Sequence, residues 1–173
     1  WVGKFNLQEG AEFQDIAMSD GQDFNAVAGS VLLTLNTNGY IFLRKHAGIA
    51  GSYVNDTHTA QAATSDFAYI ENVRTFQKAK REIRTSLLPQ LQSPLTVDAD
   101  GRLEASTVAF FQELASRPLE RMEAAGELSN FQVIIDPDQD VLSTSELAIQ
   151  AKLQPRGVAR TIKVTLGLAA RLA

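Results

Sequence analysis

The side chains best suited to catalysis in this chain are two histidines and a few hydroxyl and carboxyl groups in polar segments. His46 and His58 are twelve residues apart, and the chain contains no cysteine. Disulfides, cysteine nucleophiles and cysteine-ligated metal sites are therefore excluded. Ser52, His58 and Asp66 supply the side-chain types of a nucleophilic triad. Any polar segment of this length offers such a set, so we expect no enzyme activity.

Three aspartates share the odd-position spacing of a calcium-binding loop. They are Asp136, Asp138 and Asp140. A calcium loop of this kind needs glycine at its sixth position and glutamate at its twelfth. Those positions hold Val141 and Leu147 instead. We therefore predict a solvated turn here, and we expect neither a metal nor a cofactor.

A row of basic side chains is the third candidate. Arg74, Lys78 and Arg81 follow the i, i+4, i+7 spacing that aligns side chains on one helix face. Lys80 and Arg84 fall inside the apolar arc of the same predicted helix. Either their aliphatic stems cover apolar surface while the charges reach water, or this part of the helix faces a partner. A plain solvated helix face is the alternative.

Charge is distributed in blocks along the 173 residues. The net charge is −4, which argues against nucleic-acid binding. Residues 67–97 carry a net charge of +3, residues 98–140 a net charge of −7 and residues 141–173 a net charge of +4. Such blocks pair within one fold or between copies of the chain. No apolar run is long enough to span a membrane, so we expect no membrane partner.

Apolar spacing predicts the helices that must carry these side chains. We predict helices over residues 24–38, 67–88 and 106–125, with Pro118 kinking or splitting the third. Residues 46–65 are rich in small polar residues and predict a long loop. The predicted core draws on apolar side chains of these helices and of the strands below: Phe67, Ile70, Val73, Phe76, Val108, Phe111, Leu119, Met122, Ile149 and Val164.

We predict four strands, and apolar and polar residues alternate in the last two of them. The four strands cover residues 40–45, 131–135, 146–154 and 159–168, and the last two form an antiparallel hairpin around Pro155. We predict an α+β fold, with a small, mostly antiparallel sheet packed by two or three helices and extended terminal arms. Residues 1–22 form the N-terminal arm or the remnant of an upstream domain, and residues 23–173 form the domain. Because the chain starts at Trp1, we expect it to be part of a longer protein.

The order of these features resembles contractile tail sheath proteins. The resemblance lies in residues 39–44, in the glycine-rich loop containing residues 53–56, and in residues 66–74 at the start of the long helix. It continues through the second long helix and the strands beyond it. The resemblance covers residues 39–168 and is nearest to a prophage-type group of the sheath family.

The resemblance implies a structural subunit that polymerises as a helical sleeve around an inner tube. Its partners are then copies of itself, the inner tail-tube protein and baseplate proteins. Its location is a virion tail, or the bacterial cytoplasm during assembly. Arg74, Lys78 and Arg81 become candidates for contact with the tube. Ile162, Val164 and Leu166 become candidates for an inter-subunit strand, holding that strand to the core while its backbone edge faces a neighbour.

Two alternatives stay open at this point. One is a small α+β hydrolase or ligand-binding domain that uses the 46–65 loop. The other is a different structural protein of the tail or baseplate.

Overall fold

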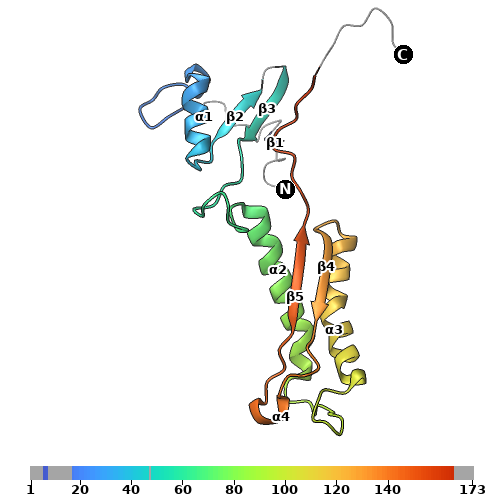
Figure 1. Ribbon diagram of the computed structural model, residues 1–173. Coiled ribbons are helices and arrows are strands. Elements are labelled where there is room, and N and C mark those ends of the chain that lie inside the picture. Colours follow the sequence, from blue (N-terminus) through green and yellow to red (C-terminus); the bar gives the residue numbers. More distant parts are fainter. Residues whose placement is uncertain (1–5, 8–16, 47, 166–173) are drawn as a thin grey trace, which may run out of the picture.

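Two α+β units lie end to end along the length of the molecule in the computed structural model, which describes residues 6–7, 17–46 and 48–165 (Figure 1). A small sheet with one helix lies at one end, and two long helices on a second sheet form the other. The α+β prediction is confirmed. The prediction of one sheet is wrong, because the strands fall into two separate sheets.

The first unit is a three-stranded antiparallel sheet. It orders β1 (Asn6–Leu7), β3 (Ile49–Val54) and β2 (Leu43–His46), with α1 (Gly29–Thr37) beside it. The loop predicted for 46–65 is therefore wrong over β3. The sequence pattern did not indicate this strand, because several of its residues are small. A strand that pairs on both sides is stabilised by ladder hydrogen bonds as well as by apolar side chains. Gly39 ends the helical segment at φ +81°, as its position predicts.

Two long helices, α2 (Ile70–Leu87) and α3 (Ala105–Ala124), form the body of the second unit. Their predicted ranges are confirmed to within three residues at each end. The buried face of α2 differs from the predicted one, since Glu71, Thr75 and Ala79 are its buried residues. Of these three residues, Ala79 packs in the core with Ala115, Leu119 and Met122 of α3.

Pro118 lies inside α3 without splitting it. Proline lacks an N–H, so the carbonyl of Leu114 one turn earlier loses its helical donor. The Ser86 hydroxyl of α2 donates a hydrogen bond to that carbonyl. The predicted split is therefore avoided, because the neighbouring helix satisfies the group that proline leaves unpaired.

The second sheet pairs β4 (Leu128–Ile134) with β5 (Gln150–Pro155) in antiparallel register, Phe131 opposite Leu153. Between them, α4 (Val141–Thr144) is capped by Asp140. Hydrogen bonds from Ser143 lower the pKa of the Asp140 carboxyl. The predicted hairpin of 146–154 with 159–168 is wrong, because β5 pairs with β4, and residues 156–165 form no strand.

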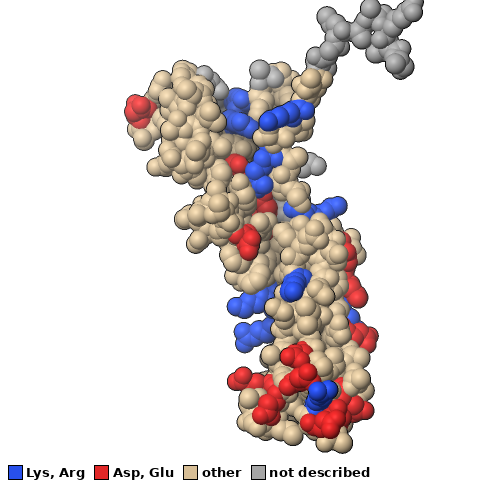
Figure 2. Space-filling view, viewed as in Figure 1, with Lys and Arg blue, Asp and Glu red and all other residues tan. Residues whose placement is uncertain are grey.

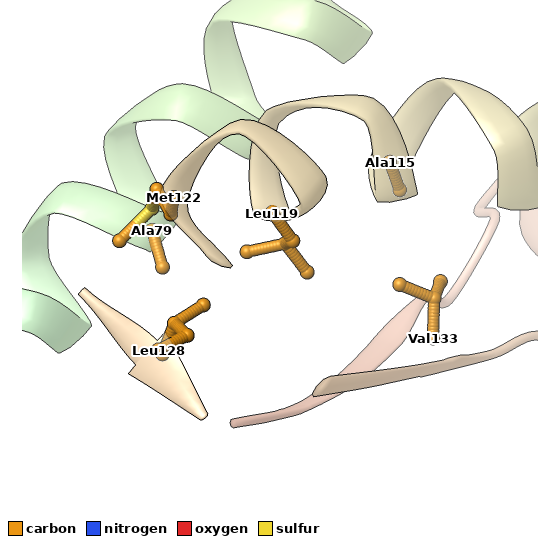
Figure 3. Packing of buried hydrophobic residues seen from close by; sticks show 6 residues of the cluster. All are labelled: Ala79, Ala115, Leu119, Met122, Leu128 and Val133. Atoms are coloured by element: carbon orange, nitrogen blue, oxygen red, sulfur yellow. The ribbon is translucent and has the colours of Figure 1, made fainter. Parts of the chain in front are cut away.

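Figure 3 shows the core between these layers, with side chains from α2, α3 and β4 converging. Leu119 and Ala115 are fully buried at its centre, and a second cluster lies around Phe111. The predicted core members Phe67, Phe76 and Val164 are wrong, since they are 40%, 41% and 74% exposed. Phe67 and Phe76 pack on one another at the surface instead.

The division of the chain into residues 1–22 and 23–173 stays a prediction. Within the described ranges, no helix is both long and apolar enough to cross a membrane.

Candidate protein-interaction surfaces

An open groove of about 870 Å³ lies along α2, where the helix faces the segment that joins α3 to β4. All three predicted tube-contact residues, Arg74, Lys78 and Arg81, line it. The opposite wall is formed by Ala125, Gly126 and Glu127. The helical spacing thus brings the three cations to one surface, which we call the basic groove.

The three cations of the basic groove differ in their partners. Lys78 donates to Glu127 at 2.7 Å, so its charge is already paired. Arg74 and Arg81 are exposed, and neither side chain makes an ion pair within the described part of the chain. An exposed, unpaired guanidinium keeps five donors free for a carboxylate or phosphate. The groove therefore suits a partner that presents acidic side chains.

Charges of opposite sign lie at different places on the second unit. Figure 2 shows basic side chains projecting along the side where α2 lies and acidic ones gathered at the end near α4. Asp136, Asp138 and Asp140 belong to that end, where Asp138 pairs with Arg102 at 2.9 Å. Among the described residues, no cluster of acids and histidines has the geometry to hold a metal ion.

The β4–β5 sheet is the second candidate interaction surface. Within the described residues it has two strands only, so the outer edges of both are without a strand neighbour. One face packs Phe131, Val133 and Leu153 toward the helices, and the other is polar except for Ile134. A two-stranded sheet is marginal by itself and gains from an added strand.

The chain leaves β5 as an extended segment, residues 156–165, which we call the arm. Every residue of the arm is exposed, and it runs from the second sheet past the first (Figure 1). Ile162 and Val164 are 80% and 74% exposed. The prediction that they hold a strand to this chain's own core is therefore wrong, and Leu166 lies outside the described residues. Apolar side chains that pack on nothing in the described part of their own chain are available to pack against another chain.

One arm residue is held firmly. The guanidinium of Arg160 binds Asp56 at 2.9 Å, also binds Glu71, and stacks 3.5 Å from the centre of the Tyr69 ring. Thr57 donates from its hydroxyl to the second oxygen of Glu71. Sequence reasoning missed this cluster. A glutamate in the first turn of α2 is ordinary for a helix N-terminus, and nothing in the sequence connects it to a residue 89 positions later.

The side chains first considered for catalysis do not form a triad. Among the residues that the structure describes, the buried Ser52 hydroxyl has no hydrogen-bond partner. His58 lies beside Asp56, its Nε2 3.5 Å from the carboxylate. No described hydrogen bond links Ser52, His58 and Asp66 to one another. The arrangement therefore lacks the nucleophile–base contact that acyl transfer requires.

A family model described as DUF2586, C-terminal domain, matches residues 66–173, well over half of the chain. The chain belongs to the DUF2586 family. The match includes α2, α3, the β4–β5 sheet and the arm, and therefore also the basic groove. No curated protein sequence matches this DUF2586 chain.

Solved structures of contractile injection systems share the fold. A chain in the cryo-EM structure of the anti-feeding prophage baseplate aligns with a TM-score of 0.66 and 19% identity, over 90% of this chain and 44% of that one. A chain of the contracted anti-feeding prophage sheath aligns with a TM-score of 0.64 and 22% identity, over 82% of this chain and 40% of that one. A chain of the contracted PVC sheath complex, from an extracellular contractile injection system, aligns with a TM-score of 0.68 and 16% identity, over 90% of this chain and 44% of that one.

These alignments confirm the resemblance to sheath proteins at the level of the fold. The DUF2586 chain spans less than half the length of the solved chains that it matches.

Proposed function

We propose that this chain is a structural subunit of a contractile injection system and that it polymerises as a helical sleeve around an inner tube. The observation that carries the proposal is the fold match, over 82–90% of the chain, to chains in two contracted sheath structures. Its partners are copies of itself, an inner tube protein and baseplate proteins. It works in an assembled particle such as a virion tail and is built in the bacterial cytoplasm.

The β4–β5 sheet and the arm supply the link between subunits. A neighbour's arm adds a strand at an open edge of the sheet, so that main-chain hydrogen bonds join the two copies. Each bond contributes about 0.5–1.5 kcal/mol net, so a strand of several pairs holds firmly while its ends stay flexible. The exposed Ile162 and Val164 then find in the neighbour the apolar cover that their own chain does not provide.

The basic groove supplies the contact with the tube. A tube surface that slides past the sleeve during contraction is held better by exchangeable charge contacts than by a dry apolar patch. Arg74 and Arg81 make that contact directly, while Lys78 is shared with Glu127. No catalytic role is assigned to His46, His58 or Asp138, and no cofactor is needed.

Reversing the two free cations of the groove is expected to weaken binding to the tube in a salt-dependent way. For Arg74→Glu/Arg81→Glu we expect about a tenfold loss of tube affinity at low ionic strength and a much smaller loss at high salt. The reason is that exposed charges are screened beyond about 8 Å at 0.15 M salt. Co-sedimentation with tubes across a salt series measures the effect.

The matched control is Lys80→Glu/Arg84→Glu, which makes the same change of charge on the same helix but outside the groove lining. It should leave tube binding within about twofold of the parent. Equal losses for both double variants, or a loss that does not change with salt, would show that the groove is not the tube contact.

A second structural role is favoured by one observation. One aligned chain comes from a baseplate structure rather than from a sheath structure. A subunit that joins a baseplate uses the same strand exchange, but its assembly ends after a single ring. Electron microscopy separates the two roles, since a ring-forming subunit gives discs and a sleeve subunit gives tubes.

A further inference from the structure

The contacts of Arg160 point to a function for this residue that the fold match does not supply. We propose that Arg160 is a positioning residue, which fixes the direction in which the arm leaves the subunit and so prepares residues 161–165 to add to a neighbour's sheet. The inference rests on the proposed function, because it names what orients the inter-subunit strand. We call Asp56, Thr57, Tyr69 and Glu71 the socket.

The socket is built for a guanidinium. The side chains of Asp56 and Glu71 are only 14% and 5% exposed. Two carboxylates that close to full burial are costly to leave without a cation and hydrogen bonds. Arg160 supplies both, because its planar fork reaches Asp56 through Nε and Glu71 through Nη2.

Tyr69 and Thr57 complete the socket. The Tyr69 ring lies 3.5 Å from the guanidinium carbon, where a cation is attracted to the face of the ring. Thr57 donates to Glu71 and also lies 3.4 Å from Nη2 of Arg160. A lysine would keep the charge but lose the fork and the stacking.

Arg160 is the fixed point of the arm. Arg156, at the start of the arm, makes one long bond of 3.3 Å to the carbonyl of Gly126. Beyond it, no described arm residue other than Arg160 makes a hydrogen bond or an ion pair. All of residues 156–165 are exposed, so without the socket the described part of the arm would have no hydrogen bond or ion pair beyond Arg156.

The position of the socket explains why attachment there matters. Asp56 follows β3 in the first unit, whereas Glu71 lies in the first turn of α2 in the second. Arg160 therefore ties the arm to the junction of the two units, which it passes in Figure 1. A strand held in its binding orientation loses less conformational freedom when it pairs, and its affinity rises accordingly.

The main test compares the parent with Arg160→Gln/Glu71→Gln. The double change removes the cation together with one of its buried acids, which avoids leaving two carboxylates around an uncharged side chain. The matched control is Arg156→Gln, which removes an exposed arginine from the same arm. Arg160→Lys keeps the charge but removes the planar guanidinium that reaches both carboxylates. We expect it to preserve the orientation of the arm only in part.

Two measurements are needed for each variant. The chain has no cysteine, so spin labels at Glu120→Cys and Thr165→Cys report the position of the arm relative to α3 without side reactions. We expect a narrow distance distribution in the parent and in Arg156→Gln, and one about twice as broad in the double variant. In unlabelled protein, we expect the concentration needed for polymerisation to rise about tenfold in the double variant and to stay within about twofold in the control.

The outcomes distinguish the two claims. An unchanged distance distribution in the double variant overturns the positioning role, whatever happens to assembly. A broader distribution with an unchanged polymerisation threshold overturns it as well, and leaves the proposed function standing. If the parent forms no polymer at all, the proposed function fails and the positioning role falls with it.

Discussion

Proline in the arm is expected to abolish sleeve formation and to leave a folded, soluble monomer. The two changes are Lys163→Pro and Val164→Pro, made separately. Consecutive N–H groups of a strand point to opposite edges, so one of the two prolines removes a donor from the edge that pairs with the neighbour. The monomer tolerates both, because residues 163 and 164 are exposed and belong to no strand in the single chain.

Circular dichroism reports the fold of each variant, and sedimentation reports polymer formation. Lys163→Ala and Val164→Ala are the controls, because they change the same side chains without removing an N–H. Val164→Ala also shortens a side chain that packs on the neighbour, so we expect it to weaken polymer formation without abolishing it. The account predicts parent-like circular dichroism for all four variants and loss of polymer for at least one proline. Sleeves from both proline variants, or unfolding of both, would rule out the arm as the link between subunits.

The second large effect is expected in the core of the second unit. Phe111→Ala should lower the free energy of unfolding by about 3–5 kcal/mol, because it removes a buried ring and leaves a cavity. Phe111 is 7% exposed and belongs to a cluster with Leu103, Ile135 and Val141. Chemical denaturation followed by circular dichroism measures the change.

Its neighbour provides a matched control. Phe110 is 47% exposed, and its ring centre lies 5.3 Å from that of Phe111. Phe110→Ala loses that ring contact and less buried surface than Phe111→Ala, so we expect a cost of about 1 kcal/mol. Similar losses for the two variants would mean that the helix does not face the core as described.

The parts of the fold that the sequence predicts are those encoded locally. Apolar spacing located α2 and α3, since packing a helix on a core requires that period over many turns. The same logic misplaced the buried face of α2. Its inner residues, among them Thr75 and Ala79, are small or polar, whereas the larger Phe76 faces outward.

Pairing between distant segments is what the sequence leaves unspecified. Alternation in residues 159–168 predicted a strand paired with the one before it. The described part, residues 159–165, forms no strand, because alternation does not specify the partner that a strand needs. Here β5 pairs with β4 instead, and the arm is left exposed. The socket was missed for the same reason, because Arg160 meets Asp56 only after folding brings residues 104 positions apart together.

The basic groove, too, was predictable only in the part that depends on local helix geometry. The i, i+4, i+7 spacing was enough to align Arg74, Lys78 and Arg81, and the groove they line depends on that local geometry. The opposite wall, with Glu127 paired to Lys78, comes from a turn after α3 and required the fold.

Electron microscopy of the purified protein, alone and mixed with tubes of its inner-tube partner, tests the central claim most directly. The account predicts hollow sleeves with a regular helical repeat, which form more readily on tubes than in their absence. Their formation should be lost with the arm prolines and retained with the alanine controls. A protein that stays monomeric at every concentration, with tubes present, would contradict the account.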